Sequence, residues 1–192
     1  MSHQTAKVTI RNSTGKALRS VHALHKYSDD YSNKQDWGKL APGETASPNL
    51  TVDYTTGALT TGRDWWVVCW EYDGDNKVYF TDPENLRGFM DVLEKSGGVV
   101  IKAALAAAAA GVAAAGTAGA GAVAGAAGGA AAGAVITDML LNSESTSGFK
   151  QHILRSEDAG KLTTIAIHPD NTVAFISHSG TSKTGSSHIS AT

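Results

Sequence analysis

The sequence has little of what redox, nucleic-acid-binding or secreted proteins rely on. Cys69 is the only cysteine among 192 residues, so no internal disulfide can form and a reducing compartment is expected. The net charge of −2 provides no basic footprint for nucleic acid, so we expect no nucleic-acid partner. The first residues lack the apolar run of a secretory signal, which favours a cytoplasmic protein.

Patterns of known catalytic chemistry are missing as well. The sequence contains no HExxH, GxSxG or P-loop pattern, so we expect no enzymatic activity and no cofactor. His22 and His25 are three residues apart on a predicted strand. They therefore point to opposite faces and cannot share a metal ion, so no metal site is predicted.

Charged and aromatic residues are also missing from one long stretch, Ala103 to Thr137, whose 35 residues include 20 Ala and 8 Gly. Near its end glycine recurs at every fourth position, at Gly121, Gly125, Gly129 and Gly133. This spacing is the glycine-zipper form of the small-xxx-small motif, which lets helices approach closely. Together with Gly111, these glycines are the predicted membrane and oligomerisation contacts. Chance replacement of Ala by Gly in an alanine tract would give the same pattern, and this alternative stays open.

A helix is predicted immediately before this stretch. Thr81-Asp82-Pro83-Glu84 offers an N-cap, a proline at the first helical position and an acidic residue for the helix dipole. An apolar stripe at helical spacing follows, formed by Leu86, Phe89, Met90 and Leu93. A single helix over 99–141 would reach about 65 Å. A helical hairpin is therefore favoured, with arms of about 16 to 20 residues that approach the length of a bilayer crossing.

The residues on both sides of this insertion predict β-strands. Short alternating runs separated by turn residues occur at 6–11, 18–27, 45–54, 63–72, 77–80, 152–155, 162–167 and 172–177, with a polar loop at 28–36. The run 63–72 is apolar on both faces, as in a central strand. The predicted fold class is mainly β with an α insertion: an antiparallel β-sandwich of about eight strands carrying an Ala/Gly-rich helical hairpin. The sandwich domain spans 1–180, the insertion 82–142, and a flexible tail 181–192.

Aromatic residues near the predicted loops are the candidates for ligand binding. Such residues, mixed with charged groups, bind sugars by ring stacking or cationic headgroups by cation–π contact. The candidates are Tyr27, Tyr31, Trp37 and Trp65, whereas Trp66 and Trp70 are assigned to the core.

Several segments carry a resemblance to a known family. They are Val8 to Asn12, Leu24 to Tyr31, Asp36-Trp37-Gly38, Thr60 to Trp66, and Ile176 to Gly180. In these runs the chain resembles the small "up-regulated in Daf" domain family over most of its length. The resemblance implies no particular reaction. The overall plan is also similar to the aegerolysin and actinoporin-like proteins, many of which bind or perforate membranes, but fold alone does not confer function.

Two functional hypotheses follow. In the first, the protein is a membrane-active, pore-forming or defence-type toxin whose glycine-zipper hairpin inserts into lipid and assembles a homo-oligomer. The sandwich would then recognise a glycan or lipid headgroup, and the protein would be membrane-associated when active. In the second, the protein is a soluble stress-response module that binds a sugar or a protein, and the hairpin serves as internal packing.

Overall fold

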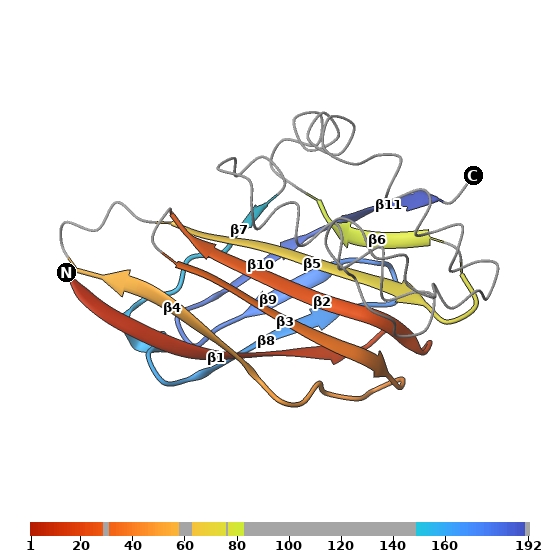
Figure 1. The fold of residues 1–192 in the computed structure, drawn as a ribbon, viewed down its shortest axis with the longest axis horizontal. Coiled ribbons are helices and arrows are strands. Elements are labelled where there is room, and N and C mark those ends of the chain that lie inside the picture. The colour runs from red at the N-terminus through yellow and green to blue at the C-terminus, as the bar shows by residue number, and fades with distance from the viewer. Residues whose placement is uncertain (29–30, 58–62, 76, 83–148, 191–192) are drawn as a thin grey trace, which may run out of the picture.

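The computed structural model describes residues 1–28, 31–57, 63–75, 77–82 and 149–190 (Figure 1). Apart from Asp82, the predicted helical insertion at 82–142 lies outside these residues, and so do its predicted contacts Gly111, Gly121, Gly125, Gly129 and Gly133. In the described part of the chain the helical structure is one 3₁₀ turn, η1 (Ser156–Asp158). No helix there has the length and apolar character needed to cross a membrane.

The described residues form two β-sheets that face each other. The first sheet has five strands in the order β10 (Thr181–Thr184), β9 (Val173–Ile176), β8 (Leu162–Ile167), β1 (Ser2–Asn12) and β4 (Leu50–Thr56). The second sheet has six strands. Five lie in the order β11 (Ser186–Ser190), β6 (Lys77–Thr81), β5 (Asp64–Tyr72), β2 (Leu18–Tyr27) and β3 (Tyr31–Leu40), and β7 (Lys150–Gln151) pairs with β5. The fold is therefore mainly β and consistent with a sandwich, as the sequence predicts.

One strand pair corrects the expectation of a purely antiparallel sandwich. β1 and β8 run parallel, in a register that pairs Lys7 with Leu162 and Asn12 with Ile167. The other named strand pairs of the described chain are antiparallel. The first sheet is thus mixed, and β1, which lies between β4 and β8, joins the N-terminal strands to the C-terminal ones.

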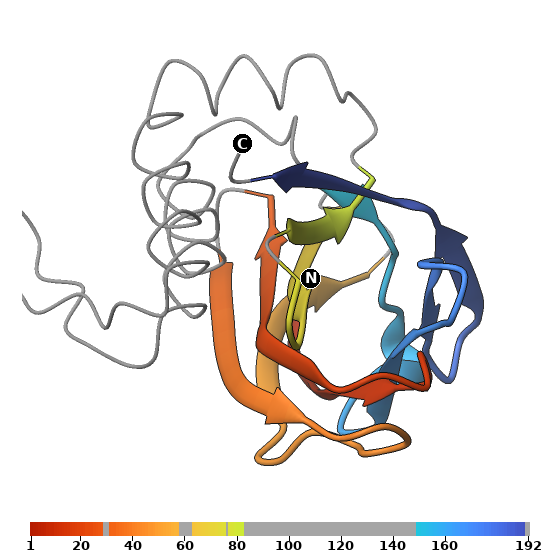
Figure 2. The ribbon, with the colours of Figure 1, turned by 90° about the vertical axis from the view of Figure 1, so that its right-hand side faces the viewer.

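The two sheets are joined along both sides, which gives the end-on view its ring-like outline (Figure 2). On one side β3 lies next to β4, where Trp37 Nε1 donates a hydrogen bond to the carbonyl of Pro48 at 2.6 Å. On the other side the chain passes from β10 in the first sheet directly to β11 in the second. Gly185 lies at this crossing, where a Cβ would come within 2.5 Å of Asp82 Oδ2. Only glycine fits without a shift of that carboxylate.

The core lies between the sheets and consists of side chains that alternate with outward-facing ones along each strand. Its largest fully buried members include Trp66, Trp70, Tyr54 and Phe175. The rings of Trp66 and Phe175, from opposite sheets, have centroids 5.9 Å apart. The assignment of Trp66 and Trp70 to the core is confirmed.

Three segments differ from the sequence predictions. The predicted polar loop at 28–36 is largely strand β3, whose outward side chains Ser32, Lys34 and Asp36 are exposed while Trp37 is buried. The predicted strand at 152–155 is irregular, because the backbone N–H of Leu154 donates to the Asp64 carboxylate instead of to a ladder. In place of a flexible tail after residue 180, the structure has β10 and β11, which pair with β9 and β6.

Candidate functional site

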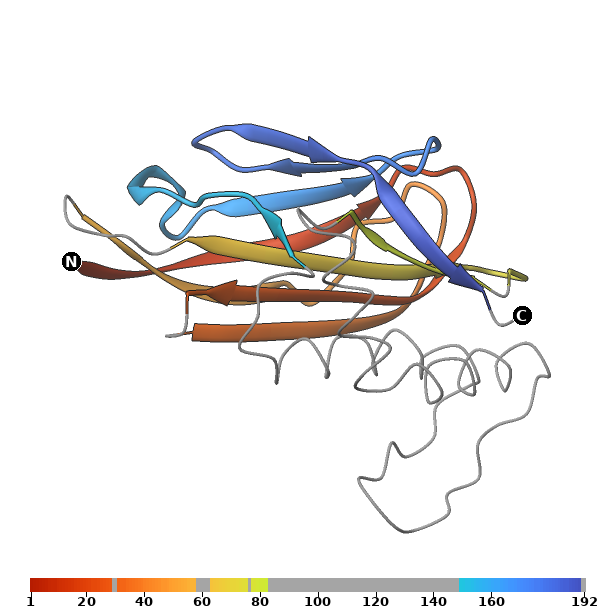
Figure 3. The same cartoon turned by 90° about the horizontal axis from the view of Figure 1, so that it is seen from above.

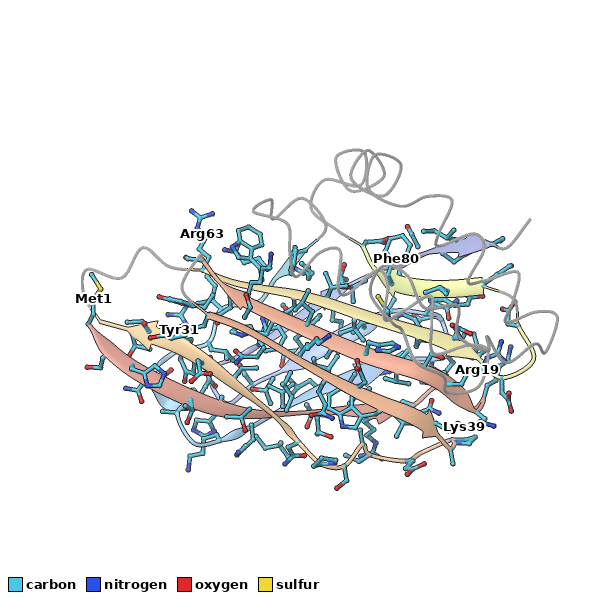
Figure 4. All side chains as sticks on the ribbon, viewed as in Figure 1. Met1, Arg19, Tyr31, Lys39, Arg63 and Phe80 are labelled. Carbon is cyan, nitrogen blue, oxygen red and sulfur yellow. The ribbon has the colours of Figure 1, made fainter. Side chains whose placement is uncertain are left out.

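A cavity of about 580 Å³ lies at one end of the sandwich. β2 and β4 end at this cleft and β5 begins there, so strand ends and loops form its walls. Its lining residues are Tyr27, Thr55, Thr56, Gly57, Arg63, Asp64, Ile153, Leu154, Arg155, Ser156 and Glu157. Figure 4 shows Arg63 at the end of the molecule that also carries Met1 and Tyr31.

Asp64, which lines this cleft, pairs with a buried histidine, His25. His25 Nε2 lies 2.8 Å from Asp64 Oδ1, and the two side chains are 0% and 1% exposed. His25 Nδ1 lies 3.3 Å from Asn33 Oδ1, an oxygen that already accepts the backbone N–H of Asp53 at 3.0 Å. Both neighbours of the ring are oxygen atoms, so each ring nitrogen has an acceptor beside it for any hydrogen that it carries.

The same Asp64 carboxylate positions the chain segment that forms the opposite wall. Its second oxygen, Oδ2, accepts the N–H of Leu154 at 2.9 Å. The neighbouring carbonyl of Arg155 accepts the Tyr54 hydroxyl at 2.9 Å, and the Trp66 indole N–H donates to the carbonyl of His152 at 2.9 Å. The backbone of 152–155 is therefore fixed by core side chains, which gives the cleft a preformed wall.

η1 continues this wall and is anchored by Asp158, which is fully buried. Its carboxylate accepts hydrogen bonds from the N–H of Arg155 at 2.7 Å and from the hydroxyl and N–H of Ser179 at 2.6 and 2.8 Å. Burial alone would raise the pKa of Asp158, but these donors outweigh it and hold the pKa below its ordinary value. An ionised carboxylate thus ties η1 to the loop before β10.

Two exposed arginines give the rim of the cleft its charge. Arg63 lies just before β5, and Arg155 lies in the irregular segment 152–155. Both line the cleft together with one exposed acidic residue, Glu157. In the described part of the chain, neither guanidinium has an acidic partner within salt-bridge distance. Ile153, 46% exposed, adds an apolar contact surface beside them.

The four predicted ligand-binding aromatics do not form one site. Tyr27 lines the cleft but is only 3% exposed, and its hydroxyl donates to the carbonyl of Thr55 at 2.9 Å. Tyr31 lies next to it, with ring centroids 6.2 Å apart, and is half-buried. Trp37 is a core residue, 5% exposed, which corrects its assignment to the surface. Trp65 faces the outside of the second sheet, because its neighbour Trp66 faces the core.

The predicted ligand-binding residues are all aromatic, so the arginines that line the cleft are not among them. Arg63 and Asp64 stand directly before the tryptophan-rich strand, and a charged residue at that place is a usable signal for a strand end at a binding site. Arg155 gives no such signal, because two distant side chains fix its position. Asp64 accepts the N–H of Leu154, 90 residues later, and Tyr54 donates to the carbonyl of Arg155, 101 residues later.

A second, smaller hollow of about 260 Å³ lies on the other side of the same irregular segment. There His152 Nδ1 lies 2.9 Å from the Ser182 hydroxyl, and Nε2 is buried with no hydrogen-bond partner in the described structure. Burial lowers the pKa of His152, so its ring is neutral at pH 7. No group of three or more His, Cys, Asp or Glu side chains within the described ranges is placed to hold a metal ion.

These features define a class: a two-sheet β protein with a preformed, cation-rimmed cleft at one open end. The chain belongs to the family described as up-regulated in long-lived daf-2, which it matches over residues 2–186. This match confirms the resemblance seen in the sequence. No curated protein matches the chain.

Proposed function

We propose that the protein is a recognition module whose end cleft binds a small anionic ligand rich in hydroxyl groups, in the chemical class of a phosphorylated sugar. The observation that carries this proposal is the pair Arg63 and Arg155, which line one cleft without acidic partners in the described chain. Guanidinium groups bind phosphate and carboxylate oxygens through paired hydrogen bonds. The hydroxyls of Thr55, Thr56 and Ser156 add donors and acceptors for a sugar.

The size and rigidity of the cleft support the same proposal. A volume of about 580 Å³ lies within the range of small-molecule sites, about 300–1,000 Å³. The wall at 152–155 is held by the buried carboxylate of Asp64, so little ordering is needed on binding. The expectations of a non-enzymatic, cofactor-free and cytoplasmic protein stay predictions beside this proposal.

The test is isothermal titration of the full chain with glucose 6-phosphate, glucose and inorganic phosphate. We expect glucose 6-phosphate to bind most tightly, and Arg63→Ala or Arg155→Ala to weaken it at least tenfold. A charged hydrogen bond contributes about 1.5–3 kcal/mol, and about 1.4 kcal/mol equals a factor of ten. The matched control is Arg11→Ala, an exposed arginine near the far end of β1, which should leave binding unchanged. Equal binding by the Arg155→Ala variant, or no binding of any of the three compounds, would refute the proposal.

We also propose a second candidate function, membrane activity, because one sequence observation favours it: the four-residue glycine spacing, which lies outside the described residues. The expected result is dye leakage from liposomes that is lost on deletion of Ala103 to Thr137 and reduced by Gly125→Leu or Gly129→Leu. The matched control is Ala127→Leu, which enlarges a small residue of the same tract outside the glycine register. Equal leakage by Gly125→Leu and Ala127→Leu would contradict a zipper, and no sedimentation with liposomes would contradict membrane activity.

A further inference from the structure

Over β2, β5 and β6, the outer face of the second sheet is buried and carries many apolar side chains. Strands β2, β5 and β6 send alternate side chains into the core and the others to the opposite side of the sheet. The latter include a set that is at most 1% exposed yet does not belong to the core cluster: Leu24, Val67, Cys69, Val78 and Phe80. Phe149, just before β7, is likewise fully buried and outside the core cluster. Leu24 pairs with Val67 and Cys69 with Phe80 across the ladders, so these side chains form one continuous outer apolar face.

Burial of this face requires a cover. A sheet face that points away from the core of a two-sheet protein meets solvent unless another layer packs on it. The neighbouring strand β3 shows the uncovered case, because its outward side chains Ser32, Lys34 and Asp36 are polar and exposed. The cover is therefore restricted to the apolar part of the sheet, over β2, β5 and β6.

The course of the chain points to the segment that supplies this cover. β6 lies beside the second half of β5 and β7 beside its first half (Figure 3). The chain leaves this face at Thr81, just after Phe80, and returns to it at Phe149. The described residues on either side of 83–148 thus both lie at the outer apolar face. The first part of 83–148 carries the apolar stripe that the sequence places on one side of a helix, Leu86, Phe89, Met90 and Leu93.

We infer that the outer apolar face of the second sheet is the docking surface for this apolar stripe. The stripe follows β6 after only a few residues, so it has the reach to cover Cys69 and Phe80 without crossing the molecule. The inference concerns residues 86–93 and is independent of the proposed end cleft. It also separates this short apolar segment from the Ala/Gly tract that follows, which has no bulky apolar stripe of comparable density.

Cys69, the sole cysteine of the chain, lies on the docking surface. Its reactions therefore measure which residues lie over that surface. A disulfide requires Cβ atoms about 3.5–4.5 Å apart, so its formation is a proximity measurement. Single cysteines are introduced at two stripe positions, Met90→Cys and Leu93→Cys. The matched controls, Asp91→Cys and Lys95→Cys, place a cysteine on the opposite side of the predicted helix. Each full-length variant is oxidised with diamide at low protein concentration, and the Cys69-linked peptides are identified by mass spectrometry.

We expect an intramolecular disulfide to Cys69 at least tenfold faster in the stripe variants than in the controls. Equal rates for both sides of the helix, or no link to Cys69, would overturn the inference. A link between two molecules, seen as a disulfide dimer, would show that a second copy covers the face and would also overturn it. As an independent measurement, Phe89→Asp should raise labelling of Cys69 by a thiol reagent at least tenfold under native conditions, while unchanged labelling would count against docking.

Discussion

The buried pair of His25 and Asp64 makes the sharpest test of how the end of the sandwich is held together. Asp64→Asn removes the charge but keeps the shape of the side chain. Both partners are almost completely buried, and the carboxylate also accepts the N–H of Leu154. Breaking a buried ion pair by removing one partner costs about 3–5 kcal/mol, because the other charge stays desolvated. Since asparagine retains one acceptor oxygen, we expect a loss of about 3 kcal/mol.

The assay is urea unfolding followed by tryptophan fluorescence. With a slope of about 2 kcal/mol per molar urea, a loss of about 3 kcal/mol lowers the midpoint by about 1.5 M. The matched control is Asp36→Asn, which removes a carboxylate that is 55% exposed and pairs with His22. Because Asp36 is more than half exposed, water screens its pair with the buried His22, so we expect a loss of about 1 kcal/mol or less and a midpoint shift of about 0.5 M or less.

A double-mutant cycle separates the ion pair from general disturbance of the core. His25→Gln combined with Asp64→Asn leaves no unpaired charge, so the double variant should lose clearly less than the sum of the two single losses. The expected coupling is about 2–3 kcal/mol. A loss below about 1 kcal/mol for Asp64→Asn, or strict additivity of the two changes, would refute the assignment of a charged, buried pair.

Two further predictions concern stability. Burial raises the pKa of Glu71 to about 7 from an ordinary 4.5, although Arg19 beside it opposes this. The folded state therefore binds a proton that the unfolded state releases, so stability should fall as pH rises from about 5 to 7.5, by at most about 3 kcal/mol. Glu71→Gln should flatten this dependence, and equal urea midpoints of the natural chain at pH 5 and pH 8 would contradict it. Truncation after Gly180 removes β10 and β11 and should lower the melting temperature by more than 10 °C. Removal of residues 191–192 alone should leave it unchanged. Equal melting curves for the two truncated proteins would show that these strands contribute nothing to stability.

Local patterns were sufficient for the strands that are rich in apolar and β-branched residues. The runs 18–27 and 162–167 match β2 and β8 in both bounds, and 63–72 differs from β5 by one residue. Their alternation follows from side chains that must reach the core, so it is visible without knowledge of the partner strand. β3 and β11 are polar. They form strands because the backbone N–H and C=O groups of β2 and β6 are there to pair with them. That cause is non-local, so composition predicted a loop and a tail instead.

The candidate site was predictable only in part, for the same reason. Tyr27 and Tyr31 are close in the chain and close in space, and the sequence placed both near a ligand. Arg155 lines the same cleft as Arg63 because Asp64 binds the backbone of a segment 90 residues later. The burial of Trp37 likewise depends on the carbonyl of Pro48 across the sandwich. Contacts between residues far apart in the chain determine which side chains line the cleft, and residue spacing in the sequence does not predict such contacts.

The parallel pairing of β1 with β8 has a consequence for synthesis in the cell. Lys7 pairs with Leu162, so 155 residues (162 minus 7) must be made before β1 acquires its second neighbour. At about 5–20 residues per second, the nascent strand waits about 8–30 s for that partner. During this time Val8 and Ile10, both fully buried in the finished protein, lack their ladder partners Thr163 and Ile165 on β8. Assembly of the first sheet therefore waits for the synthesis of β8, and until then one side of β1 is an unpaired strand edge.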